Sequence, residues 1–249
     1  MKIVLWAFHE AGYRALRKLH SSGHDLLVFT EKNSPYVPSV AELARILGHP
    51  FYVGISDKLM SETVSNFKPD LGLSMYYPRI INKAVLSVLR IGAFNFHPSL
   101  LPRHKGCFSA PWAILEGDKE TGVTCHEMVK QVDSGRILCQ SRIEISENDT
   151  AFSLYYKLVD SAVSLMEESL IKLTQYPIVL TEQDAGGCYH SREVPYGGKI
   201  DSGWPIEKVE RFIRAMYFPP HPPAEMTVGK TAYPIYSVGE YKRLLGKRV

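Results

Sequence analysis

Two polar residues, Asn95 and His97, stand two positions apart in the apolar run "AFNFH", which Pro98 follows at once. Side chains two positions apart on a strand project from the same face. Further along the chain, Asp133 lies in the short polar segment "VDSG". An imidazole can take a proton from an attacking amine, a carboxylate can orient that imidazole, and an amide N–H can stabilise an oxyanion. The residue types therefore predict a site for acyl transfer.

Each of these residues also has a plain structural explanation. Asn95 can satisfy a backbone group at a strand end, and His97 can be a capped surface imidazole. Asp133 precedes Ser-Gly, which is ordinary turn chemistry. The spacing alone leaves both interpretations open.

The elements that must position these residues alternate along the first half of the chain. Short apolar runs predict strands at residues 2–8, 25–30, 51–54, 71–77 and 93–97. Amphipathic stretches between them predict helices at Gly12–Gly23, Val40–Gly48, Ser56–Phe67 (with Ser56 as N-cap) and 82–89. This βαβα order predicts a parallel sheet covered on both faces, with ligands bound at the carboxyl edge of its strands. Pro98 ends a strand directly after His97, which places the candidate site at that edge.

The pattern then changes. Residues 122–129 and 136–145 predict two strands joined by a polar turn with Gly135, an antiparallel hairpin. A long amphipathic helix is expected from about Thr150 to Thr174, and composition shifts to Gly, Pro and Tyr beyond Tyr176. One more helix is expected at 206–216, followed by a short strand-turn-helix. The predicted fold is α/β: a Rossmann-like, mostly parallel sheet with an antiparallel hairpin as the catalytic domain (residues 1–176), plus a small C-terminal subdomain (177–249).

Composition narrows the class of protein. The 249 residues are 45% hydrophobic and 22% charged, with net charge +3, as in a soluble globular protein. The charge falls short of the basic footprint of a nucleic-acid binder and suits an anionic small molecule. The four cysteines form no C-x-x-C pair, which argues against a zinc ribbon and favours a reduced, cytoplasmic setting. The apolar run at the N-terminus is too short for a secretory signal or a membrane span.

Two segments carry a family resemblance. "FNFHPSLLPRHKG" (94–106), followed by "GVTCHEMVKQVDSGRILCQ" (122–140), closely resembles the folate-dependent formyltransferases. These include methionyl-tRNA, glycinamide ribonucleotide and nucleotide-sugar N-formyltransferases. Their pattern N-x-H-P-S-x-L-P, then G-V-T-x-H-x-M and D-x-G-x-I-L-x-Q, is present here in order. In architecture, the resemblance covers roughly residues 1–175.

The resemblance implies transfer of a formyl group from N10-formyltetrahydrofolate, as co-substrate, to an amine. His97 would be the general base toward the amine, and Asn95 would hydrogen-bond the formyl oxygen as it becomes anionic. Asp133 would hold His97 and help deliver a proton to folate N10. No metal and no covalent intermediate are expected, because the formyl group is already activated. A nucleophilic role for Cys107 or Cys125 is therefore disfavoured.

In the same family the pterin lies in a slot lined largely by backbone groups. The matching segments are Ser74–Ile81 and Lys130–Gly135. By resemblance, the wall residues would be Met75, Tyr77, Ile80 and Val132. Plain core or loop packing explains each of them equally well.

Three acceptors compete within the family. The tRNA enzyme needs a basic C-terminal barrel, and this tail has no dense Lys/Arg stripe. The glycinamide ribonucleotide enzyme opens with a Gly-rich phosphate loop, which "AFHEAGYRAL" lacks. The length and the stretch "YHSREVPYGGKID" resemble nucleotide-sugar N-formyltransferases, although Tyr196 and Gly197 depart from the commoner R-x-P-x-D-G-x-I-D form. This favours a nucleotide-linked amino sugar, most often a 4-amino-4,6-dideoxyhexose in such enzymes, which serve O-antigen biosynthesis.

A non-catalytic folate- or nucleotide-binding relative and a formyltetrahydrofolate hydrolase are the remaining alternatives. The first normally lacks one of Asn95, His97 and Asp133. The second typically carries an N-terminal regulatory domain, whereas here a strand is expected from Lys2.

Charged and aromatic residues give candidates for sugar-nucleotide contacts. The cations expected near the diphosphate are Arg79, Arg103 and Lys105, each of which is equally explained as a solvated surface charge. The aromatic residues expected to stack on the base are Tyr189, Tyr217 and Phe218. The sequence leaves open whether the base is thymidine, uridine or guanosine. Apolar residues in the Pro-rich tail suggest a homodimer, and no nucleic-acid or membrane partner is expected.

Overall fold

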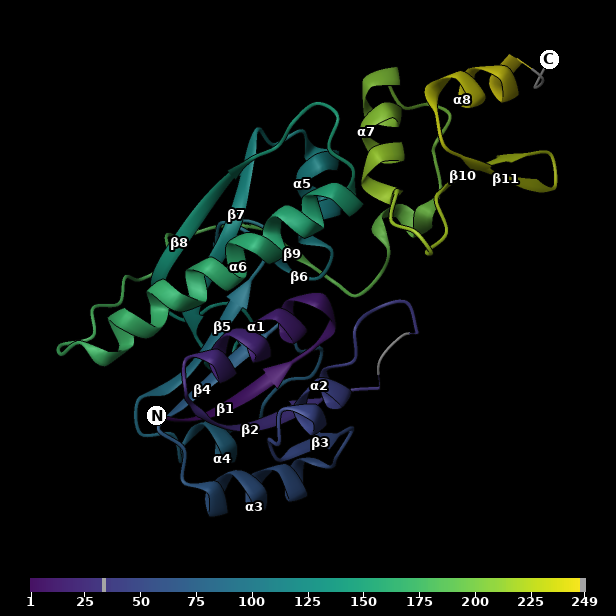
Figure 1. Cartoon of the computed structure of the whole chain (residues 1–249). Coiled ribbons are helices and arrows are strands. Elements are labelled where there is room, and N and C mark those ends of the chain that lie inside the picture. Colours follow the sequence, from purple (N-terminus) through teal and green to yellow (C-terminus); the bar gives the residue numbers. More distant parts are fainter. Residues whose placement is uncertain (33–34, 247–249) are drawn as a thin grey trace. The chain divides into compact units, whose positions relative to one another are not determined.

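A seven-stranded sheet forms the centre of the computed structural model, which describes residues 1–32 and 35–246 (Figure 1). The strand order is β3-β2-β1-β4-β5-β7-β8. The bounds are β1 Lys2–Ala7, β2 Asp25–Thr30, β3 Phe51–Val53, β4 Leu71–Met75, β5 Gly92–His97, β7 Glu120–Glu127 and β8 Ile137–Glu144. Pairing is parallel from β3 to β5, and β7 runs antiparallel to β5. The predicted α/β class with a mostly parallel sheet is confirmed.

The predicted hairpin is formed by β7 and β8. The Glu127 N–H donates to the Arg136 carbonyl at 2.8 Å, and the Gln140 amide donates to the Thr124 hydroxyl at 2.9 Å. Moving backwards along β7 thus means moving forwards along β8, which makes the pair antiparallel. The polar loop between them contains Asp133.

Helices follow the strands as predicted. Their bounds are α1 His9–Ser21, α2 Val40–Ile46, α3 Asp57–Phe67, α4 Lys83–Leu86 and α6 Ala151–Thr174. Ser39, Ser56 and Asn82 cap three of them by accepting a backbone N–H three residues on, which satisfies one of the free donors of the first turn. The predicted N-cap at Ser56 is confirmed.

The start of α1 differs from the prediction. Gly12 was expected at the helix entry, yet α1 begins at His9 and Gly12 is buried within it. A Cβ on Gly12 would lie 2.7 Å from the carbonyl carbon of Ala7. This glycine therefore lets the helix approach β1 closely, and the prediction was wrong because a packing glycine was taken for a boundary.

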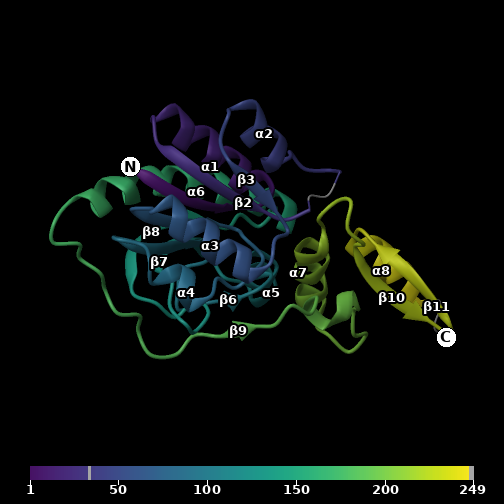
Figure 2. The same ribbon diagram turned by 90° about the horizontal axis from the view of Figure 1, so that it is seen from below.

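Both faces of the parallel sheet are covered. On one face, α1 and α6 lie side by side and are joined by ion pairs from Arg14 to Asp160 (2.5 Å) and from Lys18 to Glu167 (2.9 Å). On the other lie α3 and α4 (Figure 2). This explains why the strands are continuous apolar runs with no alternation.

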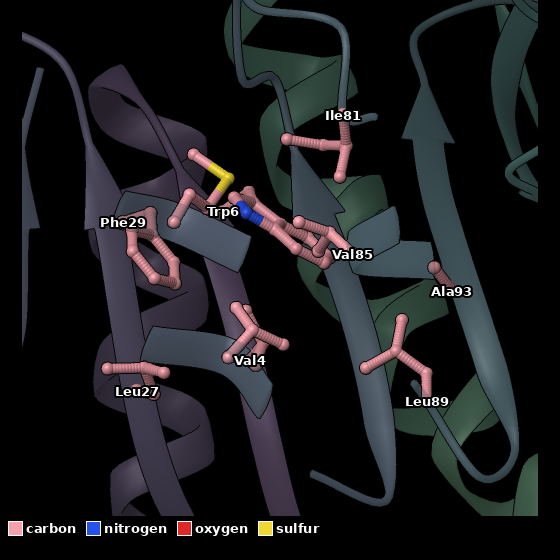
Figure 3. Close-up of a cluster of buried hydrophobic side chains, with 10 residues drawn as sticks. Val4, Trp6, Leu27, Phe29, Ile81, Val85, Leu89 and Ala93 are labelled. Carbon is pink, nitrogen blue, oxygen red and sulfur yellow. The ribbon is translucent and has the colours of Figure 1, made fainter. Parts of the chain in front are cut away.

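A buried cluster lies between the sheet and the α3/α4 layer. Val4 and Trp6 of β1 pack with Leu27 and Phe29 of β2, all at most 2% exposed (Figure 3). The cluster is completed by Met60, Val64, Ile81, Val85, Leu89 and Ala93. Burial of side chains of this size stabilises the fold by about 1.5–3 kcal/mol each. The cluster fixes the strands whose ends carry the candidate site.

The chain divides into two compact units, each described here by itself. The first comprises Met1–His97, Val123–Ser141 and Val159–Ala185, and the second Pro98–Gly122, Arg142–Leu158 and Gly186–Val249. The second unit holds β6 Lys105–Gly106, α5 Ser109–Glu116, β9 Tyr189–His190, a 3₁₀ turn at Pro195–Gly198, α7 Ile206–Met216, β10 Ala224–Val228, β11 Thr231–Ile235 and α8 Val238–Leu245. Within it α5 packs on α7, and the expected helix at 206–216 is present. The domain boundary expected at residue 176 stays a prediction.

Among residues 1–32 and 35–246, no helix combines the length and apolar character that crossing a bilayer requires.

Candidate active site

Asn95, His97 and Asp133 lie together in the first unit, and His126 joins them. The carboxylate of Asp133 lies 3.4 Å from His97 Nδ1 through one oxygen and 3.4 Å from His126 Nε2 through the other. The Asn95 amide nitrogen lies 3.2 Å from the same His126 nitrogen. We call these four residues the formyl-site cluster, after the role that the sequence resemblance predicts for three of them. Sequence reasoning proposed three of them as chemistry-bearing residues, and the structure brings these three together.

Strand pairing explains the arrangement. His97 is the last residue of β5, at its carboxyl end. Because β7 runs antiparallel to β5, His126 lies directly opposite Asn95. Sequence analysis missed His126 as a site residue, although the histidine of the family pattern G-V-T-x-H-x-M falls on it and was a usable signal. The β5–β7 register shows that it lies opposite Asn95.

The loop that carries Asp133 is held in an unusual conformation. Asp133 has a φ of 51°, in the left-handed region that few non-glycine residues adopt. At Gly135 a Cβ would lie 1.9 Å from the Glu127 carbonyl oxygen, so only glycine fits. The side chain of Gln183 donates hydrogen bonds to the carbonyls of Asp133 (2.9 Å) and Gly135 (2.8 Å). The surrounding contacts therefore fix the carboxylate in place.

The hydrogen bonds of His126 indicate which ring nitrogen carries its hydrogen. Its Nδ1 lies 3.0 Å from the Glu127 carbonyl, which can only accept, so Nδ1 carries the hydrogen. An amide nitrogen can only donate, so His126 Nε2 accepts from Asn95. One oxygen of the Asp133 carboxylate lies 3.4 Å from the same nitrogen, and both groups are at most 8% exposed.

Cys125 lies on β7 next to His126 in sequence, but its side chain points to the other face of the sheet. Successive residues of a strand point to opposite faces, so its side chain lies opposite that of His126. Burial, followed by the hydrogen bond with Cys139, raises the pKa of the Cys125 thiol well above its ordinary value. A buried, protonated thiol agrees with the expectation that Cys125 is no nucleophile.

The residues expected to line a pterin slot differ in exposure. Met75 is fully buried at the end of β4, whereas Ile80 is 70% and Val132 36% exposed. The Tyr77 hydroxyl donates to Glu31 at 2.8 Å, and burial followed by this bond raises the pKa of Tyr77. Ile80 and Val132 thus offer apolar surface to a ligand, and the role of all four residues stays a prediction.

Arg79, a predicted diphosphate contact, already has carboxylate partners. Its guanidinium pairs with Glu31 at 3.1 Å and with Asp57, and it donates to the Ile55 carbonyl at 2.6 Å. Burial lowers the pKa of Arg79, but the bond to Glu31 and the other anions outweigh burial and raise the pKa overall. A phosphate would compete with these partners, and substrate binding by Arg79 stays a prediction.

Two of the predicted substrate residues of the second unit lie on paired strands. Lys105 of β6 is aligned with Tyr189 of β9, whose ring is 64% exposed. Arg103 is exposed and lies 3.8 Å from Asp118. The ring of Tyr189 therefore has a face available for stacking.

The other two lie at the end of α7. The Tyr217 carbonyl accepts from the Phe152 N–H at 3.1 Å, and the Tyr217 side chain is 39% exposed. Phe218 packs edge-on against Phe152 and Tyr155, with ring centroids 5.6 and 5.3 Å apart. Tyr217 thus offers surface for a base, while Phe218 is engaged in an aromatic cluster.

Comparison with known proteins defines the class. Residues 5–170 match the family described as "Formyl transferase", so the chain belongs to the formyltransferase family, as the motifs predicted. GDP-perosamine N-formyltransferases of Brucella melitensis and Brucella abortus are each 40% identical over 181 residues, covering 73% of this chain and 70% of theirs.

Among solved structures, the chain is similar to an N-formyltransferase from Helicobacter canadensis in complex with folinic acid and dTDP-3-aminofucose. The TM-score is 0.79 at 21% identity, covering 95% of this chain and 86% of that one. At this identity the likeness establishes the fold, which agrees with the predicted class.

Proposed function

We propose that this protein transfers a formyl group from N10-formyltetrahydrofolate to the amine of a nucleotide-linked amino sugar, with a 4-amino-4,6-dideoxyhexose as the sugar. The observation that carries the proposal is the formyl-site cluster at the carboxyl end of β5. The names of the Brucella relatives support an amino-sugar acceptor, and the folinic acid in the Helicobacter complex supports a folate donor.

His97 is the general base in this proposal. Its Nδ1 lies 3.4 Å from Asp133, and in this proposal Nε2 takes the proton from the acceptor amine as that nitrogen attacks the formyl carbon. The carboxylate orients the ring and stabilises the imidazolium that forms.

Asn95 stabilises the developing oxyanion. Its amide nitrogen has two hydrogens, of which one is directed to His126. The second is free to donate to the formyl oxygen as negative charge builds on it. His126 thus acts as a positioning residue for the amide.

Asp133 helps to deliver the proton to the leaving group. The bond from the amine to the formyl carbon forms and the bond from that carbon to folate N10 breaks. N10 therefore gains one proton while the amine loses one to His97. The proton that His97 takes up is passed on toward N10 with the help of Asp133, whose buried carboxylate lies 3.4 Å from His97 Nδ1. A formyl group on a weakly basic aryl amine is already activated, so the step needs no metal.

Apolar surface at Ile80 and Val132 supports the folate side of the proposal. Val132 directly precedes Asp133, so a pterin against it would bring the donor close to the carboxylate. The cytoplasmic location and the homodimer stay predictions, and sedimentation of the purified chain tests the latter.

The test is a panel of GDP-, dTDP- and UDP-linked amino sugars incubated with N10-formyltetrahydrofolate, beginning with GDP-perosamine because the Brucella relatives are named for it. Mass spectrometry should find one formyl group on the sugar, and tetrahydrofolate release should depend on the amine. Glycinamide ribonucleotide and methionyl-tRNA serve as competing acceptors. Tetrahydrofolate release at the same rate without any amine would overturn the transferase proposal in favour of hydrolysis.

A further inference from the structure

A second group of chemistry-bearing side chains lies in the second unit, unrelated to the proposed reaction. It consists of His104, Cys188, His190 and Glu116, each of which offers one ligand atom within 4.8 Å of the others. His104 is buried and His190 is 9% exposed, whereas Cys188 is partly exposed and Glu116 exposed. We call these four residues the thiol–imidazole cluster.

The distances within the cluster match those of a zinc site. Cys188 Sγ lies 3.6 Å from His104 Nδ1 and 3.4 Å from His190 Nε2, and the two nitrogens are 3.0 Å apart. Tetrahedral coordination with Zn–S of about 2.3 Å and Zn–N of about 2.0–2.1 Å requires about 3.6 Å between sulfur and nitrogen and about 3.3 Å between nitrogens. A shift of a few tenths of an ångström suffices.

Asp118 orients one imidazole from behind. Its carboxylate lies 2.9 Å from His104 Nε2, which donates to it, so the lone pair of His104 is on Nδ1, toward Cys188 and His190. A carboxylate on the far nitrogen of a histidine is the usual outer partner of a metal-binding imidazole.

His190 is held in a fixed orientation. The indole of Trp112 stacks on it, with centroids 4.4 Å apart and an interplanar angle of 9°. Its Nε2 lies 3.0 Å from His104 Nδ1 and 3.4 Å from Cys188 Sγ, so the ring presents this nitrogen to the cluster.

The backbone holds the two ligand-bearing segments together. The Lys105 N–H donates to the Cys188 carbonyl at 2.9 Å, and the Cys107 N–H donates to the His190 carbonyl at 3.0 Å. At Gly106 a Cβ would lie 2.1 Å from the His190 oxygen, so this approach requires glycine. The β6–β9 pairing thus fixes the backbone next to His104, Cys188 and His190.

We propose that His104, Cys188 and His190, completed by Glu116, bind one Zn²⁺ ion as a structural site. A thiolate with two imidazoles suits zinc among the common divalent ions. Thiolate and carboxylate together balance the charge of the ion. The Glu116 side chain is exposed and can move onto the ion without disturbing the core.

The test uses the full chain, reduced and stripped of metal with a chelator, and titrates it with Co²⁺ as a spectroscopic probe. We expect one equivalent to give a thiolate-to-cobalt band in the near ultraviolet together with the visible bands of tetrahedral cobalt. Zn²⁺ should remove both. Cys188→Ser should abolish the thiolate band, while Cys107→Ser, the matched change at a nearby and partly exposed cysteine, should retain it.

Asp118→Asn provides a second variant in case Cys188→Ser fails to fold. It should keep the thiolate band but weaken Co²⁺ binding by about 10–100-fold, the usual effect of losing an outer partner. Absence of a thiolate band in the folded natural chain would overturn the proposal. So would a band that persists in folded Cys188→Ser or that Cys107→Ser removes.

Discussion

The two clusters use the same groups, two buried histidines and a carboxylate, in different orders. In the formyl-site cluster the carboxylate of Asp133 lies between the rings, 3.4 Å from a nitrogen of each. In the thiol–imidazole cluster Asp118 lies behind His104, and the two ring nitrogens face each other at 3.0 Å. A carboxylate between imidazoles favours exchange of protons. A carboxylate on the far nitrogen of one imidazole instead directs the lone pair of its near nitrogen toward the space between the two rings, where a ligand could bind.

The local backbone differs accordingly. Asp133 lies on a hairpin loop with a left-handed φ, secured by Gln183, and its partners come from paired strands of the sheet. In the thiol–imidazole cluster, His190 lies on β9, His104 and Cys188 directly precede β6 and β9, and Glu116 ends α5. In both cases a glycine permits the close approach, Gly135 in one and Gly106 in the other. The placement of the carboxylate thus distinguishes the two chemistries, more than the identity of the residues does.

The largest expected effect is the loss of the shared carboxylate. Asp133→Asn keeps the size of the side chain but removes the negative charge beside His97, and His97→Ala removes the proposed base. We expect either change to lower kcat by at least about 100-fold, the scale of losing a general base or its partner. Steady-state kinetics with the accepted amino sugar measure it. Asp184→Asn, the same change at an exposed carboxylate, is the control, and near-natural turnover in both site variants would contradict the mechanism.

The next effect concerns the loop. In Gly135→Ala the new Cβ must move away from the Glu127 oxygen, only 1.9 Å from its ideal position, which displaces Asp133. We expect kcat to fall by about 10–100-fold, since misplacement of a catalytic group by an ångström costs that much. Gly239→Ala is the matched control, because a Cβ there meets nothing closer than 3.8 Å. Equal turnover in both variants would show that the loop geometry is unimportant.

A smaller effect is expected at His126. In His126→Gln the new side chain still lies opposite Asn95, but the ring nitrogen that holds the Asn95 amide in place is lost. Loss of one positioning hydrogen bond, worth about 1 kcal/mol, should lower kcat by about 5–10-fold with KM for the amine little changed. A change confined to KM would assign His126 to substrate binding and not to positioning.

The smallest effect is expected at Asp149, a carboxylate with a structural role that lies outside both clusters. Asp149 accepts from the Ser146 N–H (2.8 Å), the Ser153 hydroxyl (2.7 Å) and Lys157 (2.6 Å). Burial alone would raise its pKa, but Lys157 and the other donors outweigh burial and hold the pKa below its ordinary value. A depressed pKa stabilises the fold above the unfolded value, about 3.9, and this contribution is lost as pH falls through the folded pKa.

Asp149→Asn should therefore lower the free energy of unfolding by about 1–2 kcal/mol at pH 7, consistent with loss of charged hydrogen bonds. Urea unfolding at pH 7 and below pH 4 measures it, and the difference between variant and natural chain should shrink in acid. A difference independent of pH would mean that the side chain acts through packing alone.

The sequence predicted most accurately those elements whose signals lie within a short stretch of the chain. The strand at 25–30 and the helix at 206–216 were predicted with their bounds because apolar runs and amphipathic spacing are local properties. The grouping of Asn95, His97 and Asp133 followed from family motifs that carry positional information.

What sequence missed depends on pairing between distant segments. His126 joins the formyl-site cluster only through the β5–β7 register. The thiol–imidazole cluster joins His104 to Cys188 across 84 positions, and no spacing rule connects them. The early start of α1 was missed because the sequence does not distinguish a glycine that permits close packing, such as Gly12, from one that marks a helix boundary.

The pairing of Asn95 with His126 also limits how this chain can change in length. Insertion or deletion of one residue within β7 ahead of His126 would turn every following side chain to the other face of the sheet. Cys125 or Glu127 would then stand opposite Asn95, and the imidazole would point away from the carboxylate. Among related chains, gaps should therefore be absent between residues 122 and 126, whatever sugar each chain accepts.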